Sequence, residues 1–325
     1  MRDSRSTHVR GLPTVEHVTS PRTALLTGAN QGLGYALAEG LASRMRPDDL
    51  VLLTGRNPDR VAEAAARLSG GTARVEGRAL DVTDADAVQG LADELRECSG
   101  GVDIVFSNAG ARMTPAAEPA SEVDAVVDTY NLGAIRMLRS FGPVLRKGGR
   151  FFVVASTFGT LGHLDPRLRP LFDDAGSLAD VEKVLAAWRA AVHDGTAEAQ
   201  GWPRWLNVPS KIAQVAAVRV VAAERRERDL RDDTLIAAVC PGLIDTEASR
   251  PWFTDMSQAQ SPDEAATALL DLALAETANP TMYGELVRFG QVLPWRAEIA
   301  AESRAEARVR APALLTTSET LDDHG

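Results

Sequence analysis

Three glycines that follow a short apolar segment are the first feature of the sequence with a chemical meaning. They stand in TGANQGLG, between the segment TALLT and a helical pattern. Without side chains, such a backbone turns tightly and approaches a pyrophosphate, and the start of the helix offers amide donors and a favourable dipole. The pattern predicts a dinucleotide site. The loop residues assigned to the cofactor are Gly28, Asn30, Gly32, Leu33 and Gly34.

The end of the second apolar segment, LLTGRNPDR, indicates which dinucleotide binds. NAD enzymes usually place a carboxylate here to hold the ribose 2′-hydroxyl. Positions 53–57 hold no carboxylate, whereas Arg56 and Arg60 stand four residues apart where a 2′-phosphate would lie. The alternative is that both are ordinary surface arginines at a helix start. The sequence therefore predicts NADP(H) as the cofactor.

Two further strand ends are assigned to the cofactor. Asp81, followed by Val82, ends the third segment, where a carboxylate can meet the adenine amino group. The alternative role for Asp81 is a helix N-cap. Asn108, Ala109 and Gly110 end the fourth segment and would let the backbone approach the cofactor. Their alternative role is a plain turn.

Strand and helix patterns alternate along the chain, which predicts an α/β fold with a doubly wound parallel sheet, the Rossmann type. Near-continuous apolar runs indicate strands buried on both faces. The predicted strands are 23–27, 50–54, 74–80, 102–107, 150–155, 234–239 and one near 285–289. The predicted helices are 33–45, 58–69, 84–97, 121–146, 208–227 and 262–276.

No internal repeat or low-complexity linker divides the chain, so we predict one domain over residues 22–296. Residues 157–206 form a long insertion before a helix and carry a helical pattern of their own over 177–194. The remaining segments, 1–21 and 297–325, are expected to be tails.

Together these motifs resemble the short-chain dehydrogenase/reductase family, and in particular its carbonyl reductases. The resemblance covers roughly residues 22–295 and includes the glycine loop, the sequence NAG at 108–110 and CPGLIDT at 240–246. The last motif matches a turn that covers the nicotinamide, which assigns four more residues to the cofactor. They are Pro241, Gly242, Ile244 and Thr246. The long insertion is typical of the carbonyl reductases and implies a monomer.

The resemblance also implies a catalytic set of Asn, Ser, Tyr and Lys. In this family tyrosine donates the proton, serine holds the substrate oxygen, lysine binds the ribose and lowers the tyrosine pKa, and asparagine organises a relay water. Ser156 and Lys211 take the serine and lysine positions, and Lys211 is also assigned to the cofactor. In NVPSK, however, Asn207 occupies the tyrosine position, and an amide is no proton donor of useful pKa.

A tyrosine stands instead at the position of the family asparagine. The family reads D-V-N-x-x-G with a proline ten residues after the glycine, and this chain reads DTYNLG at 128–133 followed by Pro143. Aligned without a gap, Tyr130 takes the asparagine position. One hypothesis is that Tyr130 supplies the phenol while Asn207 fills the space the tyrosine left. The other is a slip of one residue, in which Asn131 keeps the usual role and Tyr130 is a packed aromatic.

Other side chains are candidates for the substrate end of the site. His163 and His193 lie in the insertion, and histidine is a natural acid near neutral pH. Trp202 and Trp205 either line a pocket for a flat hydrophobic substrate or pin the insertion to the core. The segment after the CPG turn contains three large apolar residues, Trp252, Phe253 and Met256. They form either a substrate lid or a hydrophobic patch.

Composition excludes several classes of function. A net charge of −10 argues against nucleic acid and anionic membranes as partners, and no apolar run approaches the ~20 residues of a membrane span. No cluster has metal spacing. Two distant cysteines and the lack of a signal-peptide pattern favour the cytoplasm.

Three functions remain open. The first is an NADPH-dependent reductase of a carbonyl, quinone or imine group on a small hydrophobic substrate, with an atypical proton donor. The second is a non-redox cyclase, dehydratase or isomerase on the same scaffold, favoured by loss of the family tyrosine. The third is a catalytically impaired NADP-binding protein, against which the retained Ser156 and Lys211 argue.

Overall fold

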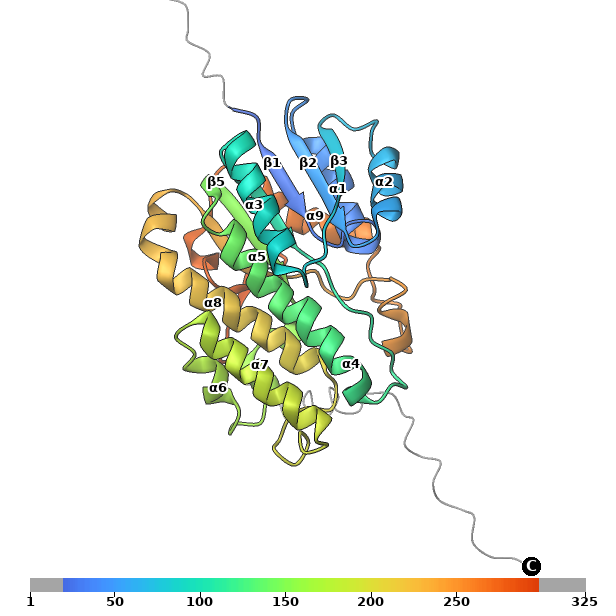
Figure 1. The fold of residues 1–325 in the computed structure, drawn as a ribbon, viewed down its shortest axis with the longest axis vertical. Helices are drawn as coiled ribbons and strands as arrows, with labels where there is room; N and C mark the ends of the chain where they lie inside the picture. Colours follow the sequence, from blue (N-terminus) through green and yellow to red (C-terminus); the bar gives the residue numbers. More distant parts are fainter. Residues whose placement is uncertain (1–19, 298–325) are drawn as a thin grey trace, which may run out of the picture.

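The strands form one sheet in the order β3-β2-β1-β4-β5-β6-β7-β8 in the computed structural model, which describes residues 20–297 (Figure 1). All neighbours pair in parallel except β7 and β8, which are antiparallel. The strands are β1 (Thr23–Leu26), β2 (Leu50–Gly55), β3 (Arg74–Ala79), β4 (Val102–Ser107), β5 (Leu145–Val154), β6 (Leu235–Cys240), β7 (Leu286–Arg288) and β8 (Gln291–Leu293). The predicted doubly wound sheet is confirmed, and the short β8 hairpin strand was not predicted.

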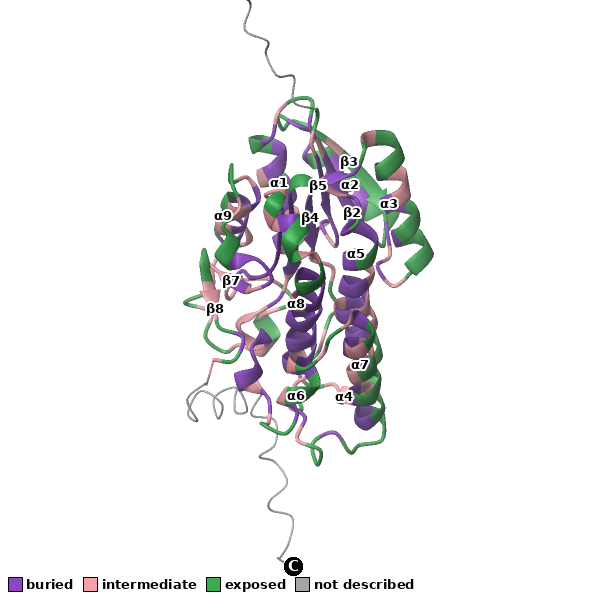
Figure 2. Ribbon diagram, turned by 90° about the vertical axis from the view of Figure 1, so that its left-hand side faces the viewer, coloured by how far each residue is buried: buried purple, intermediate pink, exposed green. Residues whose placement is uncertain are grey.

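Helices cover both faces of this sheet (Figure 2). On one face α1 packs against α9, and on the other α5 packs against both α3 and α8. The helices are α1 (Gly32–Arg44), α2 (Pro58–Arg67), α3 (Ala85–Ser99), α4 (Pro119–Val126), α5 (Gly133–Phe141), α6 (Arg169–Asp173), α7 (Leu178–His193), α8 (Asn207–Arg231) and α9 (Pro262–Ala273). None of those in the described range is long and apolar enough to cross a membrane.

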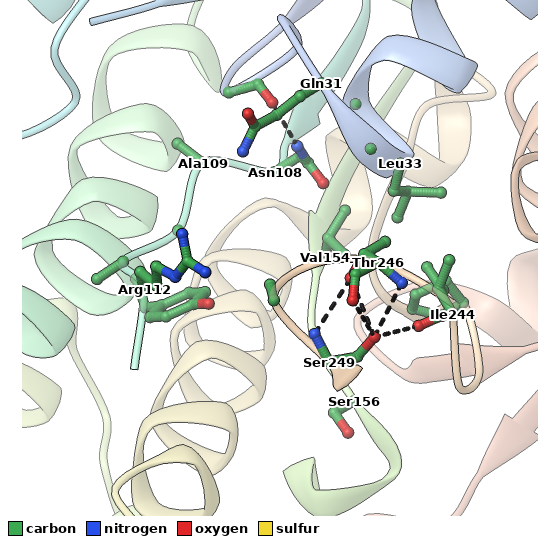
Figure 3. Close-up of a pocket in the computed structure, with 18 of the residues that line it drawn as sticks. Gln31, Leu33, Asn108, Ala109, Arg112, Val154, Ser156, Ile244, Thr246 and Ser249 are labelled. Atoms are coloured by element: carbon green, nitrogen blue, oxygen red, sulfur yellow. Dashed lines mark hydrogen bonds between the residues drawn. The ribbon is translucent and has the colours of Figure 1, made fainter. Parts of the chain in front are cut away.

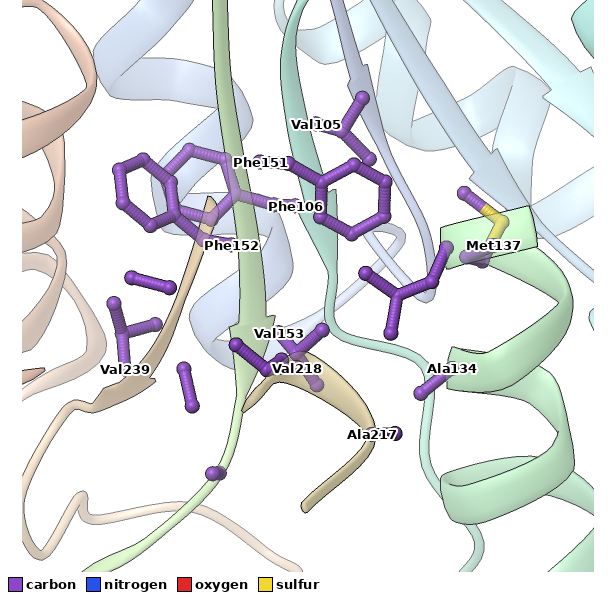
Figure 4. Packing of buried hydrophobic residues seen from close by; sticks show 14 of the residues in the cluster. Val105, Phe106, Ala134, Met137, Phe151, Phe152, Val153, Ala217, Val218 and Val239 are labelled. Carbon is purple, nitrogen blue, oxygen red and sulfur yellow. The ribbon is translucent and has the colours of Figure 1, made fainter. Parts of the chain in front are cut away.

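The core fills both faces of the sheet, with buried residues from the central strands and from α1, α5, α8 and α9, and Figure 4 shows part of it. Phe106 on β4 and Phe152 on β5 have ring centroids 5.2 Å apart. Both are almost fully buried, as are Val218 on α8 and Met137 on α5. Because the core locks the ends of β4, β5 and β6 into register, the residues just beyond these ends are held at fixed positions.

The helix predicted over 121–146 was wrong in two respects. It ends at Phe141, because Gly142 and Pro143 follow and proline cannot continue a helix. It is also interrupted by one π turn, η1 (Val127–Leu132), between α4 and α5. A π turn adds one residue to the helical repeat and changes the directions in which the side chains point. This turn contains both Tyr130 and Asn131.

The insertion packs against the catalytic side of the domain. It holds the short turns η2 (Thr157–Gly159) and η3 (Leu161–His163), followed by α6 and α7. Helix α7 packs against α4, η1 and α8 (Figure 1). Trp202 is buried and contacts Phe172 and Trp188, with ring centroids 6.2 and 6.1 Å away. Trp202 therefore holds α6 and α7 of the insertion together. The predicted tails, 1–21 and 297–325, lie almost entirely outside the described residues.

Candidate active site

A cleft of about 1170 Å³ opens at the carboxyl ends of the strands. This is larger than the roughly 300–1,000 Å³ of most ligand pockets, so a dinucleotide and a second small molecule have room together. It is lined by every residue predicted for the cofactor or for catalysis except Asp81. Figure 3 shows the glycine loop and Asn108 facing Thr246 and Ser249 across this cleft.

The end of β4 holds the glycine loop, residues 28–34, in place. Asn108 Nδ2 donates to the carbonyl oxygens of Thr27 (3.0 Å) and Gly28 (3.2 Å), and Thr27 Oγ1 accepts from the amides of Asn108 and Ala109. Gly28 has φ +61°, and a Cβ there would lie 2.8 Å from Ala109 Cα. A side chain at this position is therefore excluded by conformation and by space, and the N-terminus of α1 stays open to an anion.

Arg56 and Arg60 border the same cleft at the end of β2 and the start of α2. Asn57 is the N-cap of α2 and accepts a 3.0 Å hydrogen bond from the Arg60 amide, which fixes this turn. Within residues 20–297 neither guanidinium forms an ion pair, so both are available to an anion. These residues fit a dinucleotide that carries a 2′-phosphate.

The structure distinguishes between the two hypotheses for Tyr130 and Asn131, which both lie in the π turn. Tyr130 lines the cleft. Asn131 is 1% exposed, and its Nδ2 donates 2.8 Å to the carbonyl oxygen of Ser210 on α8. Asn131 therefore joins two helices inside the protein, and the residue that faces the cleft is the tyrosine.

Tyr130 lies between a glycine and a lysine. On one side, a Cβ on Gly110 would lie 2.5 Å from its Cε1 and 2.7 Å from its hydroxyl oxygen. On the other side, Lys211 Nζ is 4.4 Å from the ring centroid, a cation–π contact. Burial raises the pKa of Tyr130, so the phenol is protonated at neutral pH.

Lys211 is bound by uncharged acceptors alone. Its Nζ donates 3.1 Å to the Val154 carbonyl and 2.9 Å to Gln214 Oε1, and the Gln214 amide donates 3.0 Å to the Tyr130 carbonyl. Gln214 thus links the lysine to the backbone of the π turn. Burial without a carboxylate partner lowers the pKa of Lys211 from 10.5 to about 7.

Ser156 and Asn207 complete the predicted catalytic set in the cleft. Ser156 follows β5, and its Oγ accepts a long 3.4 Å hydrogen bond from the Phe158 amide, which leaves its proton available to a ligand. Asn207 is the first residue of α8, and its side-chain amide makes no hydrogen bond to any described residue. Both side chains can donate to an oxygen atom placed in the cleft.

The turn after β6 forms the opposite wall. Its residues Pro241, Gly242, Ile244 and Thr246, which the family resemblance assigns to the cofactor, line the cleft. Ser249 holds the turn closed, since its hydroxyl contacts Thr246 Oγ1 (3.0 Å) and donates to the Ile244 carbonyl (Figure 3). A Cβ on Gly32 would lie 3.8 Å from Thr246 Cγ2, so this turn lies close to the glycine loop.

An aromatic wall, consisting of Phe158, Trp205 and Trp252, borders the cleft beside Ser156. Trp205 stacks on Trp252 at 5.3 Å between ring centroids, and Phe158 meets Trp205 edge-on at 4.9 Å. Phe253 also lines the cleft. Such a wall is suited to a flat, hydrophobic ligand.

Several sequence candidates lie elsewhere. Asp81 does not line the cleft, and its carboxylate accepts two hydrogen bonds from Thr83. It is not a helix N-cap either, because the N-cap of α3 is Asp84. His193 contacts Asp124 on the surface, His163 contacts Thr160, and neither histidine lines the cleft. Trp202 and Met256 do not line it either.

The residues that the sequence did not identify include Arg112 and Arg288, which line the cleft, and Gln214, which does not line it but binds Lys211. Gln214 stands three residues after Lys211, so helical spacing could have placed the two side chains together. No local pattern distinguishes Arg112 or Arg288 from surface arginines. The described residues contain no group of three or more His, Cys, Asp or Glu able to hold a metal ion.

Comparisons with known proteins agree with this geometry. The family model described as short chain dehydrogenase matches residues 22–164. NADPH carbonyl reductase 1 of Rattus norvegicus is 26% identical over 84% of this chain and 98% of its own, and that of Bos taurus is 28% identical over the same shares. Menthone neomenthol reductase from Mentha piperita shares the fold, with 24% identity, a TM-score of 0.66 and coverage of 84% and 100%. Over residues 22–164 the chain is therefore similar to the short-chain dehydrogenases, and over most of its length it is similar to NADPH carbonyl reductases.

Proposed function

We propose that the protein is an NADPH-dependent reductase of a carbonyl, quinone or imine group on a small hydrophobic substrate, with Tyr130 as proton donor. The observation that carries this proposal is the placement of Tyr130 in the cleft, with its ring centroid 4.4 Å from Lys211 Nζ, while Asn131 is turned into the protein. The names of the similar carbonyl reductases support both NADPH and a carbonyl substrate.

The cleft residues divide the chemistry between them. The glycine loop, Arg56 and Arg60 would hold NADPH, which would supply the hydride for the substrate carbon. Ser156 and Asn207 donate hydrogen bonds to the substrate oxygen, where negative charge develops. Tyr130 gives its proton to that oxygen, and the Lys211 ammonium stabilises the phenolate that results. The hydride and the proton together convert the carbonyl into an alcohol.

The test is NADPH binding and oxidation by the purified protein with a panel of ketones, quinones and imines. Consumption of NADPH with an equal yield of reduced product is the expected result. Tight NADPH binding without turnover of any compound would contradict the proposal and would favour the non-redox scaffold.

We also infer a cytoplasmic monomer without nucleic-acid or membrane partners, supported by the acidic net charge and by the cover that α7 gives to α4 and α8.

Removal of the two cleft arginines tests the choice of cofactor. The double variant Arg56→Ala/Arg60→Ala should weaken NADPH binding by about tenfold or more, because each charge-assisted hydrogen bond to a phosphate is lost. NADH lacks the 2′-phosphate, so its affinity should not change. Titration calorimetry with both cofactors measures this. Arg67→Ala, on the same helix but paired with Glu63, is the matched control. Equal losses for both cofactors would remove the 2′-phosphate from the explanation.

A methyl group on Gly110 tests whether the position of the phenol matters. In Gly110→Ala the new Cβ would lie 2.5–2.7 Å from three atoms of Tyr130, so the ring must move. We expect kcat to fall by about tenfold or more, since a shift near 1 Å in a catalytic group costs up to ~100-fold. Gly90→Ala, where nothing lies within 4 Å of the new Cβ, is the control for the same substitution. An unchanged kcat in Gly110→Ala would contradict a role for Tyr130.

A further inference from the structure

Arg288 is a cation at the cleft that forms no ion pair with any residue of 20–297. It is the last residue of β7, pairs in register with Cys240 at the end of β6, and lines the cleft. Among residues 20–297 its guanidinium has no hydrogen-bond acceptor and no carboxylate partner, and its Nε is buried and unpaired. By contrast, the buried Arg150 is paired with Asp233 and with backbone carbonyls. Arg288 is only partly buried, but its Nε is out of contact with water and lacks an acceptor, which is unfavourable, so an anion from a ligand is the expected complement.

The neighbouring residue holds this guanidinium in place. Arg288 Cζ lies 5.0 Å from the centroid of the Phe289 ring. Phe289 has φ +48°, a conformation that side chains other than those of Gly, Asn and Asp rarely adopt, and 46% of it is exposed. Burial therefore does not account for this strained aromatic. A stack on one face of the guanidinium does, because it leaves the N–H groups free for a planar anion.

The phosphates of the cofactor are too far away to be this anion. The glycine loop follows β1 and the two cleft arginines follow β2, whereas β4, β5 and β6 separate β1 from β7. Four strand spacings of ~4.8 Å therefore place Arg288 roughly 19 Å across the sheet from the glycine loop. Ser156, after β5, is only two strands away. The arginine is therefore at the substrate end of the cleft.

We propose that the substrate is a planar aromatic carbonyl compound that carries a carboxylate, and that Arg288 binds this carboxylate. The proposal rests on the proposed function, and it adds the substrate class. The aromatic wall contacts the ring system, Ser156 and Tyr130 meet the carbonyl, and the fork of Arg288 matches a carboxylate in two parallel hydrogen bonds. Arg288 is thus a specificity-determining residue.

The experiment compares 4-benzoylbenzoate with its neutral methyl ester. Dissociation constants are measured by titration calorimetry with NADP⁺ present, so the result does not depend on turnover. Wild-type protein should bind the acid at least about tenfold tighter than the ester, as expected for hydrogen bonds to a charged group. Arg288→Met should abolish this preference while the affinities for the ester and for NADPH stay as they are.

Two other arginines make the result specific. Arg226→Met removes an exposed arginine that also lies over an aromatic ring, that of Tyr283, outside the cleft, and should leave every affinity unchanged. Arg112→Met removes another arginine that lines the cleft and has no ion pair among residues 20–297. Loss of the preference in Arg112→Met instead of Arg288→Met would overturn the proposal. So would a wild-type protein that binds the acid no tighter than the ester, or binds neither. Failure of the proposed function would appear separately, as carboxylate binding without reduction.

Discussion

Tyr130→Phe should lower kcat by about 10²- to 10⁴-fold, the usual contribution of a general acid, and leave the dissociation constant of NADPH unchanged. The substitution removes only the hydroxyl group. The ring that Lys211 and Gly110 contact is kept, and so is the backbone carbonyl that accepts from Gln214. A large loss of kcat without a change in thermal stability would therefore show that the reaction needs the proton of the Tyr130 hydroxyl group.

The control for this variant is Tyr35→Phe. Tyr35 lies on α1, contacts Arg67 and does not line the cleft, so kcat should be unaffected. A kcat for Tyr130→Phe equal to that of wild type would remove the phenol from the mechanism. The proton would then have to come from another donor, such as water.

An exchange of the two residues gives a test by gain of activity. Tyr130→Asn combined with Asn207→Tyr places the phenol on α8, four residues before Lys211, which is the arrangement implied by the family resemblance. The double variant should recover turnover relative to Tyr130→Asn alone. No recovery would show that the cleft is now shaped for a phenol on the π turn only.

The sequence predicts most of this site because many of its residues occupy strand ends. The glycine loop, the segment 108–110 and the turn 241–246 each follow a buried strand, and parallel strands place such segments at one edge. Lys211 and Ser156 were assigned because they match the family's lysine and serine positions. These predictions needed no knowledge of how distant side chains meet.

The choice between Tyr130 and Asn131 could not be made from the sequence. In a regular helix, adjacent residues point about 100° apart, and the π turn changes these directions at this point. No residue type in VDTYNL indicates a π turn in advance. Arg288 escaped prediction for a different reason: its importance depends on the strand order, which brings β7 to the substrate end, and on the lack of a partner.

The pH dependence of kcat/KM should show the titration of Lys211. This parameter reports the ionisations of the free enzyme, in which burial lowers the pKa of Lys211 to about 7. Below that pH the side chain is an ammonium and stabilises the Tyr130 phenolate formed on proton transfer. Above it the neutral amine does not. We therefore expect kcat/KM for a neutral ketone to fall by about tenfold per pH unit above the inflection.

Gln214→Glu should move that inflection to higher pH by about one unit or more. The substitution keeps the size of the side chain but places a carboxylate where the amide oxygen now lies, 2.9 Å from Lys211 Nζ. An adjacent negative charge favours the ammonium, so the pKa of Lys211 rises and activity persists to more alkaline pH. The hydrogen bond to the Tyr130 carbonyl is lost, which should lower thermal stability.

Two further variants distinguish this electrostatic effect from a structural one. Gln214→Met removes both hydrogen bonds without adding charge, so it should lower stability but should not raise the inflection. Gln200→Glu makes the same chemical change on the exposed part of the insertion and should leave the profile as it is. If the profile of Gln214→Glu coincides with that of wild type, Lys211 does not set the inflection. The ammonium would then have no part in stabilising the phenolate, and the pairing of Tyr130 with Lys211 would be a packing contact alone.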